Sequence, residues 1–373
     1  MGSRALPPTA LDVLVIGAGQ AGLATGYHLR STGLRYELFE RHGRLGDSWR
    51  MRFDSLALFT PRSYSALPGL ALVGDPDAFP AKDEIADYLE RYGQHFALPV
   101  RLDAEVVSLE KIDERFRATI ADGSIVDARA VVIASGAFQA PAIPPLASGA
   151  SAHVAQLTPD AYANPASVPP GTVLVVGDGA TGRHIAQELA ATHRAVLAGG
   201  RPRRLVPDRI LGRSGFWWLD RLGLARASRY SRIGRWLHSR DPFPGRGLDL
   251  AHLRAAGVEI LPRLTGVDGS TARFADGRSV DIDSVVWATG YRDESSWVRI
   301  PGASDEAGQF IESRGISPVP GLFFVGRSWQ RNRGSALLLG VGADARFVIR
   351  QIRHRLGSDA AGRVETASDA DHR

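Results

Sequence analysis

Two copies of the motif Gly-x-Gly-x-x-Gly, separated by the length of a domain, constrain this chain more than any other feature. The first copy, GAGQAG, spans residues 17–22, and the second, GDGATG, spans residues 177–182. Each copy follows a short apolar run and precedes a stretch with helical spacing, an order typical of dinucleotide-binding βαβ units. One such motif is a weak signal, but two in this context predict an α/β fold with two Rossmann-like dinucleotide-binding domains.

The first motif is followed by an acidic residue where such folds bind a ribose. Gly17 permits the tight turn, Gly19 lets the backbone approach a pyrophosphate, and Gly22 lets the helix pack closely on the strand. The next strand, expected at 35–39, ends at Glu40. Its carboxylate can accept hydrogen bonds from both ribose hydroxyls and would repel a 2′-phosphate, so this site is predicted to hold FAD or NAD.

The second motif differs at the equivalent place. After the strand expected at 194–198, the chain has Gly200, Arg201 and Arg203, with no acidic residue. A guanidinium there can make two hydrogen bonds to a 2′-phosphate, which predicts NADPH as the ligand of the second domain. The alternative is that these arginines form a solvated basic turn.

Two later segments also repeat each other. VVIASG at 131–136 and VVWATG at 285–290 are each expected to form a buried strand that ends in small residues, and each follows alternating strands with an Ala-Asp-Gly turn. This symmetry favours two related domains. The small residues would let the backbone pass close to a cofactor.

Together with these segments, GDSW at 46–49, ATGY at 288–291 and GLFFVG at 321–326 resemble the flavin-containing monooxygenases with two dinucleotide-binding domains. The likeness covers residues 12–352 and is strongest to the plant YUCCA-type enzymes and their bacterial relatives. It implies that the second domain is inserted into the first.

The resemblance divides the chain into three parts. Residues 1–163 and 285–373 would form a discontinuous FAD-binding domain, and residues 164–284 the NADPH-binding domain. The tail after about residue 357 is polar and is predicted to be disordered.

The resemblance also assigns candidate cofactor-binding residues to both domains. Those for FAD are Gly17, Ala18, Gly19, Gln20, Ala21, Gly22, Glu40, Arg41, Gly46, Ser48, Trp49, Val107, Ala134, Ser135, Gly136, Gly326 and Leu337. Those for NADPH are Gly177, Asp178, Gly179, Ala180, Thr181, Gly182, Gly200, Arg201, Arg203, Ala288, Thr289 and Gly290.

Three residues are candidates for the catalytic site: Trp49, Thr60 and His153. Trp49 would approach the flavin, and Thr60, with Phe59, stands where several relatives place an asparagine beside it. His153 belongs to a stretch that keeps the glycine and histidine of an interdomain segment of the family, with Ala147 in place of a phenylalanine. His153 is therefore either a hinge or coupling residue or a structural one.

The family's activity implies an FAD- and NADPH-dependent monooxygenase that transfers one oxygen atom of O₂ to a small organic substrate through a C4a-(hydro)peroxyflavin. Two alternatives remain open at this stage. One is an NADPH-dependent flavin reductase or oxidase that delivers electrons to an acceptor without thiols, and the other is a non-catalytic FAD-bound sensor. The chain has no cysteine, which excludes a dithiol mechanism and thiolate metal sites; no metal is expected.

Composition argues against nucleic acid as a partner. The net charge is +5, but 40 acidic residues are spread among the 45 basic ones, so no extended basic stripe is predicted. No apolar run approaches the ~20 residues needed to cross a bilayer, and a cytoplasmic protein is the default expectation. The sequence leaves a homodimer open.

One segment is left without a role by these motifs. Residues 214–238 alternate aromatic and aliphatic residues with arginines in a helical, amphipathic pattern. The first interpretation is a helical excursion that packs on the NADPH domain. The alternatives are a lid over an apolar substrate and a basic face in peripheral contact with a membrane.

Overall fold

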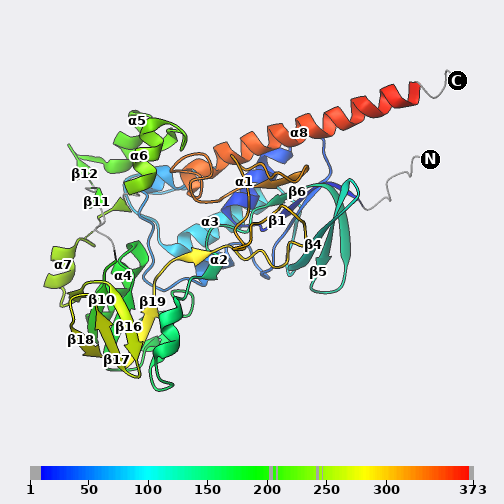
Figure 1. Ribbon diagram of the computed structural model, residues 1–373. Coiled ribbons are helices and arrows are strands. Elements are labelled where there is room, and N and C mark those ends of the chain that lie inside the picture. The colour runs from blue at the N-terminus through cyan, green and yellow to red at the C-terminus, as the bar shows by residue number, and fades with distance from the viewer. Residues whose placement is uncertain (1–9, 201–204, 207–208, 241–242, 246, 369–373) are drawn as a thin grey trace.

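The computed structural model contains two α/β domains joined side by side (Figure 1). It describes the chain except residues 1–9, 201–204, 207–208, 241–242, 246 and 369–373. Each domain is built on its own sheet, and each sheet carries one glycine motif between a central strand and the helix that follows it. The predicted fold class, two Rossmann-like domains with one inserted into the other, is confirmed.

The first domain has a seven-stranded sheet. Its path runs through β3 (Val100–Arg101), β2 (Tyr36–Phe39), β1 (Leu11–Ile16), β6 (Ile125–Ile133), β5 (Arg115–Ile120) and β4 (Val106–Ile112), and β21 (Leu322–Phe324) also pairs with β6. The strands β3, β2, β1, β6 and β21 pair in parallel, whereas β4, β5 and the start of β6 form an antiparallel meander. The chain therefore returns to this sheet from its far end, as the resemblance implied.

Helices cover the first sheet. They are α1 (Gln20–Leu29), α2 (Asp47–Arg50), the 3₁₀ turn Arg62–Tyr64, α3 (Lys82–His95) and α8 (Leu338–Ser368). The helices α1 and α8 run side by side, and small residues of α1 permit this close approach. A Cβ on Gly26 would already lie 3.2 Å from the Leu38 side chain, so the helix packs tightly on β2.

The second domain repeats this plan with a five-stranded sheet. The order is β15 (Glu259–Leu261), β10 (Arg194–Ala198), β9 (Thr172–Val176), β19 (Ser284–Trp287) and β8 (Ala155–Leu157), all parallel. The helices α4 (Ala180–Leu189) and α7 (Leu250–Ala255) and the 3₁₀ turns Pro145–Gly149 and Pro165–Ser167 accompany it. An antiparallel meander of β16 (Leu264–Asp268), β17 (Thr271–Phe274) and β18 (Ser279–Asp281) precedes β19, as β4 and β5 precede β6.

The structure shifts the domain boundaries predicted at 163/164 and 284/285, the first by about twenty residues and the second by about six. The strand β8 and the whole of β19 belong to the second sheet, and Ala147 and Val154 pack in its core. The two crossings between domains form a short antiparallel pair, β7 (Ala140–Pro141) with β20 (Tyr291–Arg292). The second domain therefore extends from about residue 142 to about residue 290.

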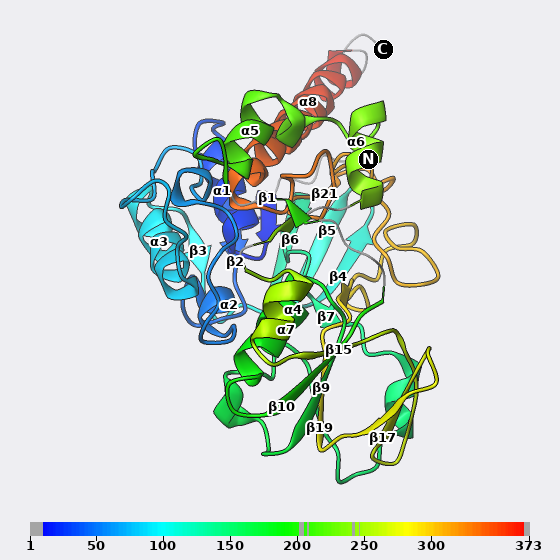
Figure 2. The ribbon, with the colours of Figure 1, turned by 90° about the vertical axis from the view of Figure 1, so that its left-hand side faces the viewer.

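The segment between β10 and α7 leaves the second domain. It contains β11 (Leu205–Val206), β12 (Arg209–Ile210), β13 (Arg213–Ser214), α5 (Gly215–Arg221), the 3₁₀ turn Leu224–Arg226, α6 (Arg232–Arg240) and β14 (Phe243–Pro244). We call residues 209–240 the excursion. Figures 1 and 2 both show its helices beside the first turns of α8.

The predicted helices of the excursion exist, but the expectation that they pack on the second domain is corrected. The Arg229 amide donates to the Arg331 carbonyl at 2.9 Å, and the Arg229 guanidinium donates to the Trp329 carbonyl at 3.0 Å. Phe216 stacks on Phe59 with ring centroids 6.2 Å apart. The excursion therefore bridges from the second domain to the first.

The C-terminal tail is also corrected. It continues α8 as a helix to Ser368, where disorder was expected beyond residue 357. Alanine, arginine and glutamate favour helix, so a polar sequence here extends a helix that is already nucleated. No helix among the described residues has both the length and the apolar character that a membrane span needs.

Candidate functional site

The first glycine turn is shaped by two close backbone contacts. Gly17 has φ of +97°, in the left-handed region that favours glycine, and a Cβ on Gly22 would lie 1.8 Å from the Gly17 carbonyl oxygen. Gly19 faces open space, where the nearest atom to a built Cβ is the Ser48 Oγ at 4.0 Å. The turn and the N-terminus of α1 therefore leave room for a ligand to approach the backbone, as a pyrophosphate requires.

Glu40 lies beside this turn, at the carboxyl end of β2. Its Oε2 accepts a hydrogen bond from the Ala18 amide at 2.8 Å, and its Oε1 accepts one from the His42 amide at 3.2 Å. The residue is 9% exposed. Two backbone donors thus hold a carboxylate at the edge of the turn, where the spacing of the sequence placed it.

Further candidates of the first domain gather at the same sheet edge. A Cβ on Gly17 would lie 2.7 Å from the Ala134 carbonyl oxygen, and one on Gly326 would lie 2.6 Å from the Ala21 Cβ. The Gln20 amide donates to the Ala336 carbonyl at 2.7 Å, which brings the segment before α8, with Leu337, to the start of α1.

The segment at 46–49 also belongs to this region. Gly46 has φ of +89° and begins α2, and a Cβ there would lie 2.4 Å from the Ala86 carbonyl oxygen. Ser48 is exposed near Gly19, while Trp49 is half-buried against the core of the first domain. Ser135 and Gly136 follow β6, and Gly136 faces open space.

The second glycine turn repeats the geometry of the first. Gly177 has φ of +110°, and a Cβ on Gly182 would lie 1.9 Å from the Gly177 carbonyl oxygen. Nothing lies within 4 Å of a Cβ built on Gly179. Ala180 and Thr181 begin α4, and Thr181 is exposed at its N-terminus. This turn also leaves its backbone open to a ligand.

The segment after β19 closes the second turn. A Cβ on Gly177 would lie 2.3 Å from the Ala288 carbonyl oxygen. The Thr289 hydroxyl donates to the Ala142 carbonyl at 2.6 Å, and Gly290 has φ of +96° with open space beside it. Because β7 and β20 start from the carboxyl ends of β6 and β19, the open edges of both sheets meet the same domain junction.

Sequence reasoning missed Arg183, a buried cation directly after the second motif. It is 2% exposed, and its guanidinium donates to the Asp178 carbonyl at 3.0 Å and the Leu248 carbonyl at 2.9 Å. Its Nη2 also lies 3.4 Å from the Asp178 Oδ2. The guanidinium thus offsets the charge of Asp178 and fixes the shape of the turn. The signal was an arginine on the otherwise apolar buried face of α4.

A polar cluster at the junction connects the two domains and was also missed. Arg52 donates to Asp160 at 2.7 Å and to the Tyr291 hydroxyl at 2.9 Å, and Tyr291 donates to the same Asp160 oxygen at 2.7 Å. The Arg52 guanidinium lies over the rings of Phe138 and Tyr291. Burial, with the hydrogen bond to Asp160, raises the pKa of Tyr291 to about 12.

A second group of hydrogen bonds holds α4 against the loop after α2. The Ser55 hydroxyl donates to Glu188 at 3.0 Å and lies 3.2 Å from the His184 ring, and Tyr162 donates to the same Glu188 oxygen at 2.9 Å. These bonds and the Arg52 cluster fix how the second glycine turn is oriented toward the first domain.

Two predicted catalytic residues, His153 and Thr60, lie in different surroundings. His153 is exposed and precedes β8, so it lies at the amino-terminal edge of the second sheet, opposite the glycine turn. Thr60 is buried, and its hydroxyl lies 2.8 Å from the Ser65 hydroxyl within a local turn. The Thr60 side chain is thus held within its own loop, and the catalytic role of each residue stays a prediction.

The remaining candidates lie at the periphery. Arg41 is exposed beside His42, and Val107, on β4, is 43% exposed. Gly200 is exposed after β10, in line with the second turn. Arg201 and Arg203 lie outside the described residues.

Comparisons with known proteins agree with this geometry. A family model described as pyridine nucleotide-disulphide oxidoreductase matches residues 14–204. An uncharacterized CzcO-like oxidoreductase of Geobacillus kaustophilus is 46% identical over 343 residues, which are 92% of this chain and 98% of that protein. Indole-3-pyruvate monooxygenase YUCCA1 of Oryza sativa subsp. japonica is 27% identical over 391 residues, covering 91% of this chain and 90% of the relative.

Among solved structures, a flavin-containing monooxygenase from Stenotrophomonas maltophilia superimposes with a TM-score of 0.78 at 29% identity. The match covers 92% of this chain and 98% of that one, so both domains and their connection correspond. The chain therefore belongs to the pyridine nucleotide-disulphide oxidoreductase family and, within it, to the flavin-containing monooxygenases.

Proposed function

We propose that the protein is an FAD- and NADPH-dependent monooxygenase that transfers one oxygen atom of O₂ to a small organic substrate. The observation that carries the proposal is the pair of open glycine turns, at Gly19 and Gly179, whose sheet edges meet one domain junction. The relatives whose printed names state an activity, the rice indole-3-pyruvate monooxygenase and the Stenotrophomonas enzyme, support oxygen transfer as the reaction class.

The first turn fits FAD. The open space beside Gly19 accommodates a pyrophosphate against the N-terminus of α1, and Glu40 is held where the adenine ribose would present its hydroxyls. Gly136, Ser48 and the segment at Gly326 would border the rest of the cofactor. When bound, the flavin supplies hydride acceptance and reaction with O₂.

The second turn fits a nicotinamide dinucleotide. Gly179 leaves its backbone open at the N-terminus of α4, and Arg183 neutralises Asp178 so that the turn does not repel phosphate. The position equivalent to Glu40 has Gly200 followed by Arg201, which favours the 2′-phosphate of NADPH over the free hydroxyl of NADH.

The protein's own task in this reaction is positioning. The Arg52–Asp160–Tyr291 cluster and the Ser55–Glu188 contact fix the junction on which both sheet edges open. The excursion bridges the two domains and would limit the access of water between them. No base of the Ser-His-Asp type is needed for such a reaction.

Rapid mixing of the purified yellow protein tests the proposal. The protein is first reduced by NADPH without oxygen, and the flavin absorbance is followed after O₂ is admitted. A transient band distinct from the oxidised and reduced flavin spectra supports the monooxygenase. Reoxidation without such a band, with stoichiometric hydrogen peroxide in the presence of candidate substrates, favours the reductase or oxidase. Absence of reduction by NADPH would leave only the binding-protein alternative.

A further inference from the structure

The excursion combines exposed apolar side chains with a high density of arginines. Four of its large apolar side chains are more than half exposed: Leu211 at 86%, Leu222 at 64%, Trp236 at 55% and Ile233 at 53%. Between residues 209 and 240 the chain also has eight arginines and one acid, Asp220. A surface that combines exposed apolar side chains with this charge is expected to meet a partner.

The outward side of α6 brings both kinds of side chain together. Gly234 and Leu237 are buried and face the protein, whereas Arg232, Arg235 and Trp236 are exposed. Spacings of three and four residues place these three side chains on one face of a helix. The Arg240 guanidinium also lies 5.8 Å from the Trp236 ring centroid. The outward face of α6 is therefore a tryptophan surrounded by cations.

A hairpin presents a further apolar side chain to solvent. The strands β12 and β13 are joined by a two-residue turn, Leu211-Gly212, in which both residues have positive φ, 48° and 75°. Asparagine, aspartate or glycine is usual at the first position of such a turn, because a larger side chain is strained there. A leucine that is both strained and 86% exposed gains nothing from the folded chain itself.

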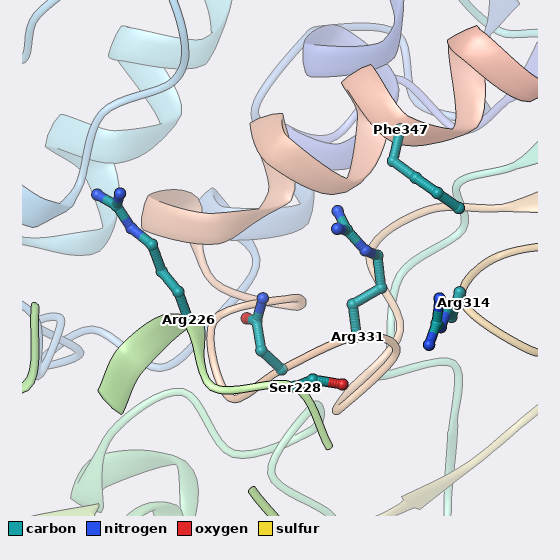
Figure 3. A pocket seen from close by; sticks show the side chains of 6 residues that line it. Arg226, Ser228, Arg314, Arg331 and Phe347 are labelled. Atoms are coloured by element: carbon teal, nitrogen blue, oxygen red, sulfur yellow. The ribbon is translucent and has the colours of Figure 1, made fainter. Parts of the chain in front are cut away.

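A hollow at the inner border of the excursion extends the basic surface (Figure 3). It has a volume of about 190 Å³ and is lined by Arg226, Arg314 and Arg331, with Ser228, Asn332 and Phe347. Arg331 pairs with Asp344, but Arg314 is exposed and packs over the Tyr230 ring, which is itself 47% exposed. The three guanidinium groups come from separate segments, so the charge continues from the excursion onto the first domain.

We propose that the outward surface of the excursion docks the protein on an anionic lipid bilayer. Trp236, Leu222 and Leu211 would enter the headgroup layer, and the arginines would contact lipid phosphates. Two observations select this partner. The eight-to-one excess of arginine opposes a symmetric contact with a second copy, which would place like charges together. Four exposed large apolar side chains are also a poor match for a nucleic acid, because most protein contacts there go to phosphates and to the edges of bases.

Flotation of the purified full-length holoprotein with lipid vesicles tests this proposal. At low salt, the protein is expected to bind vesicles of mixed phosphatidylglycerol and phosphatidylcholine and to remain free of pure phosphatidylcholine vesicles. The double variant Arg232→Ser/Arg235→Ser should weaken partitioning about 25-fold, at about fivefold for each arginine. Trp236→Ser should weaken it by about tenfold or more at an unchanged salt dependence.

The matched control is Arg254→Ser/Arg353→Ser, which removes the same charge from exposed positions of α7 and α8. It should retain wild-type partitioning, and all three variants should keep the wild-type flavin content and thermal midpoint because the replaced side chains are exposed. An equal loss in the control would overturn the proposal, since binding would then follow net charge alone.

Three other outcomes also overturn it. One is the absence of any preference for anionic vesicles. Another is duplex DNA that displaces the vesicles and binds Trp236→Ser as well as it binds wild type. The third is self-association that Trp236→Ser abolishes in protein that does not float. None of these readouts depends on the redox reaction, so the docking proposal and the proposed activity can fail separately.

Discussion

Gly179 and Gly182 lie one helical turn apart, yet an alanine at each is expected to have opposite effects. A Cβ on Gly182 would lie 1.9 Å from the Gly177 carbonyl oxygen, far inside van der Waals contact. The helix α4 would have to move away from β9, and overpacking of this kind costs about 1–3 kcal/mol. At about 2–4 °C per kcal/mol for a domain of this size, Gly182→Ala should lower the melting temperature by about 2–12 °C.

Gly179→Ala should instead leave the fold intact and weaken NADPH binding. Gly179 has φ of −70° and ψ of 178°, which any residue adopts, and no atom lies within 4 Å of the built Cβ. Alanine at a helix N-cap costs about 1 kcal/mol, offset by about 0.4–1 kcal/mol through the lower entropy of the unfolded chain. The methyl group projects into the space proposed for the pyrophosphate. If its overlap there costs about 1–3 kcal/mol, the dissociation constant rises about 5- to 150-fold.

Two assays on the same preparations separate these effects. Circular dichroism gives the melting temperature, and calorimetric titration with NADP⁺ gives the dissociation constant, with each variant serving as the control for the other. Wild-type affinity in Gly179→Ala would refute the placement of the dinucleotide against this turn. A wild-type melting temperature in Gly182→Ala would refute the close contact between α4 and the turn.

Four other changes probe the same site. Glu40→Gln removes the charge but keeps the size, and we expect about 10- to 100-fold weaker FAD retention from the loss of a charged acceptor, measured by flavin release on dialysis; full retention would contradict the ribose role. Arg201→Ala should raise the KM for NADPH by about tenfold or more and leave the KM for NADH unchanged. An equal rise for both cofactors would show that Arg201 does not contact the 2′-phosphate. Arg183→Met withdraws a guanidinium from the buried Asp178 and should cost about 3–5 kcal/mol in chemical denaturation, with partial recovery in Arg183→Met/Asp178→Asn; no recovery would show that charge is not the cause. Tyr291 is protonated in the folded state up to about pH 12, whereas the unfolded residue ionises near pH 10, so stability should fall as pH rises through this window. Tyr291→Phe should lessen that fall but not remove it, because burial also raises the pKa of Tyr88, Tyr92 and Tyr162; a pH profile identical to that of the wild type would exclude a contribution from Tyr291.

The parts of the site that depend on contacts between residues close in the chain could be predicted from the sequence. The order of strand, glycine turn, helix and acidic residue occupies only the thirty residues 11–40. Within it, the close contact of Gly22 with Gly17 and the position of Glu40 follow from steric rules for a single βαβ unit. The doubled motif likewise determined two related domains, because an inserted copy repeats the same local plan. The first domain boundary could not be predicted, because β8 has three residues, too few to show the alternation of apolar and polar residues that marks a strand.

Only the tertiary structure decided which distant residues meet. Arg183 contacts Leu248, and Arg52 meets Asp160 and Tyr291, across separations of 65 to 239 residues that no periodicity encodes. It placed His153 at the edge of the second sheet opposite the glycine turn, and it turned the excursion toward the first domain. Local backbone sterics are written in neighbouring residues, whereas these contacts exist only after two separately folded sheets have packed against each other, so the sequence determined the two glycine turns and the packing determined the junction between them.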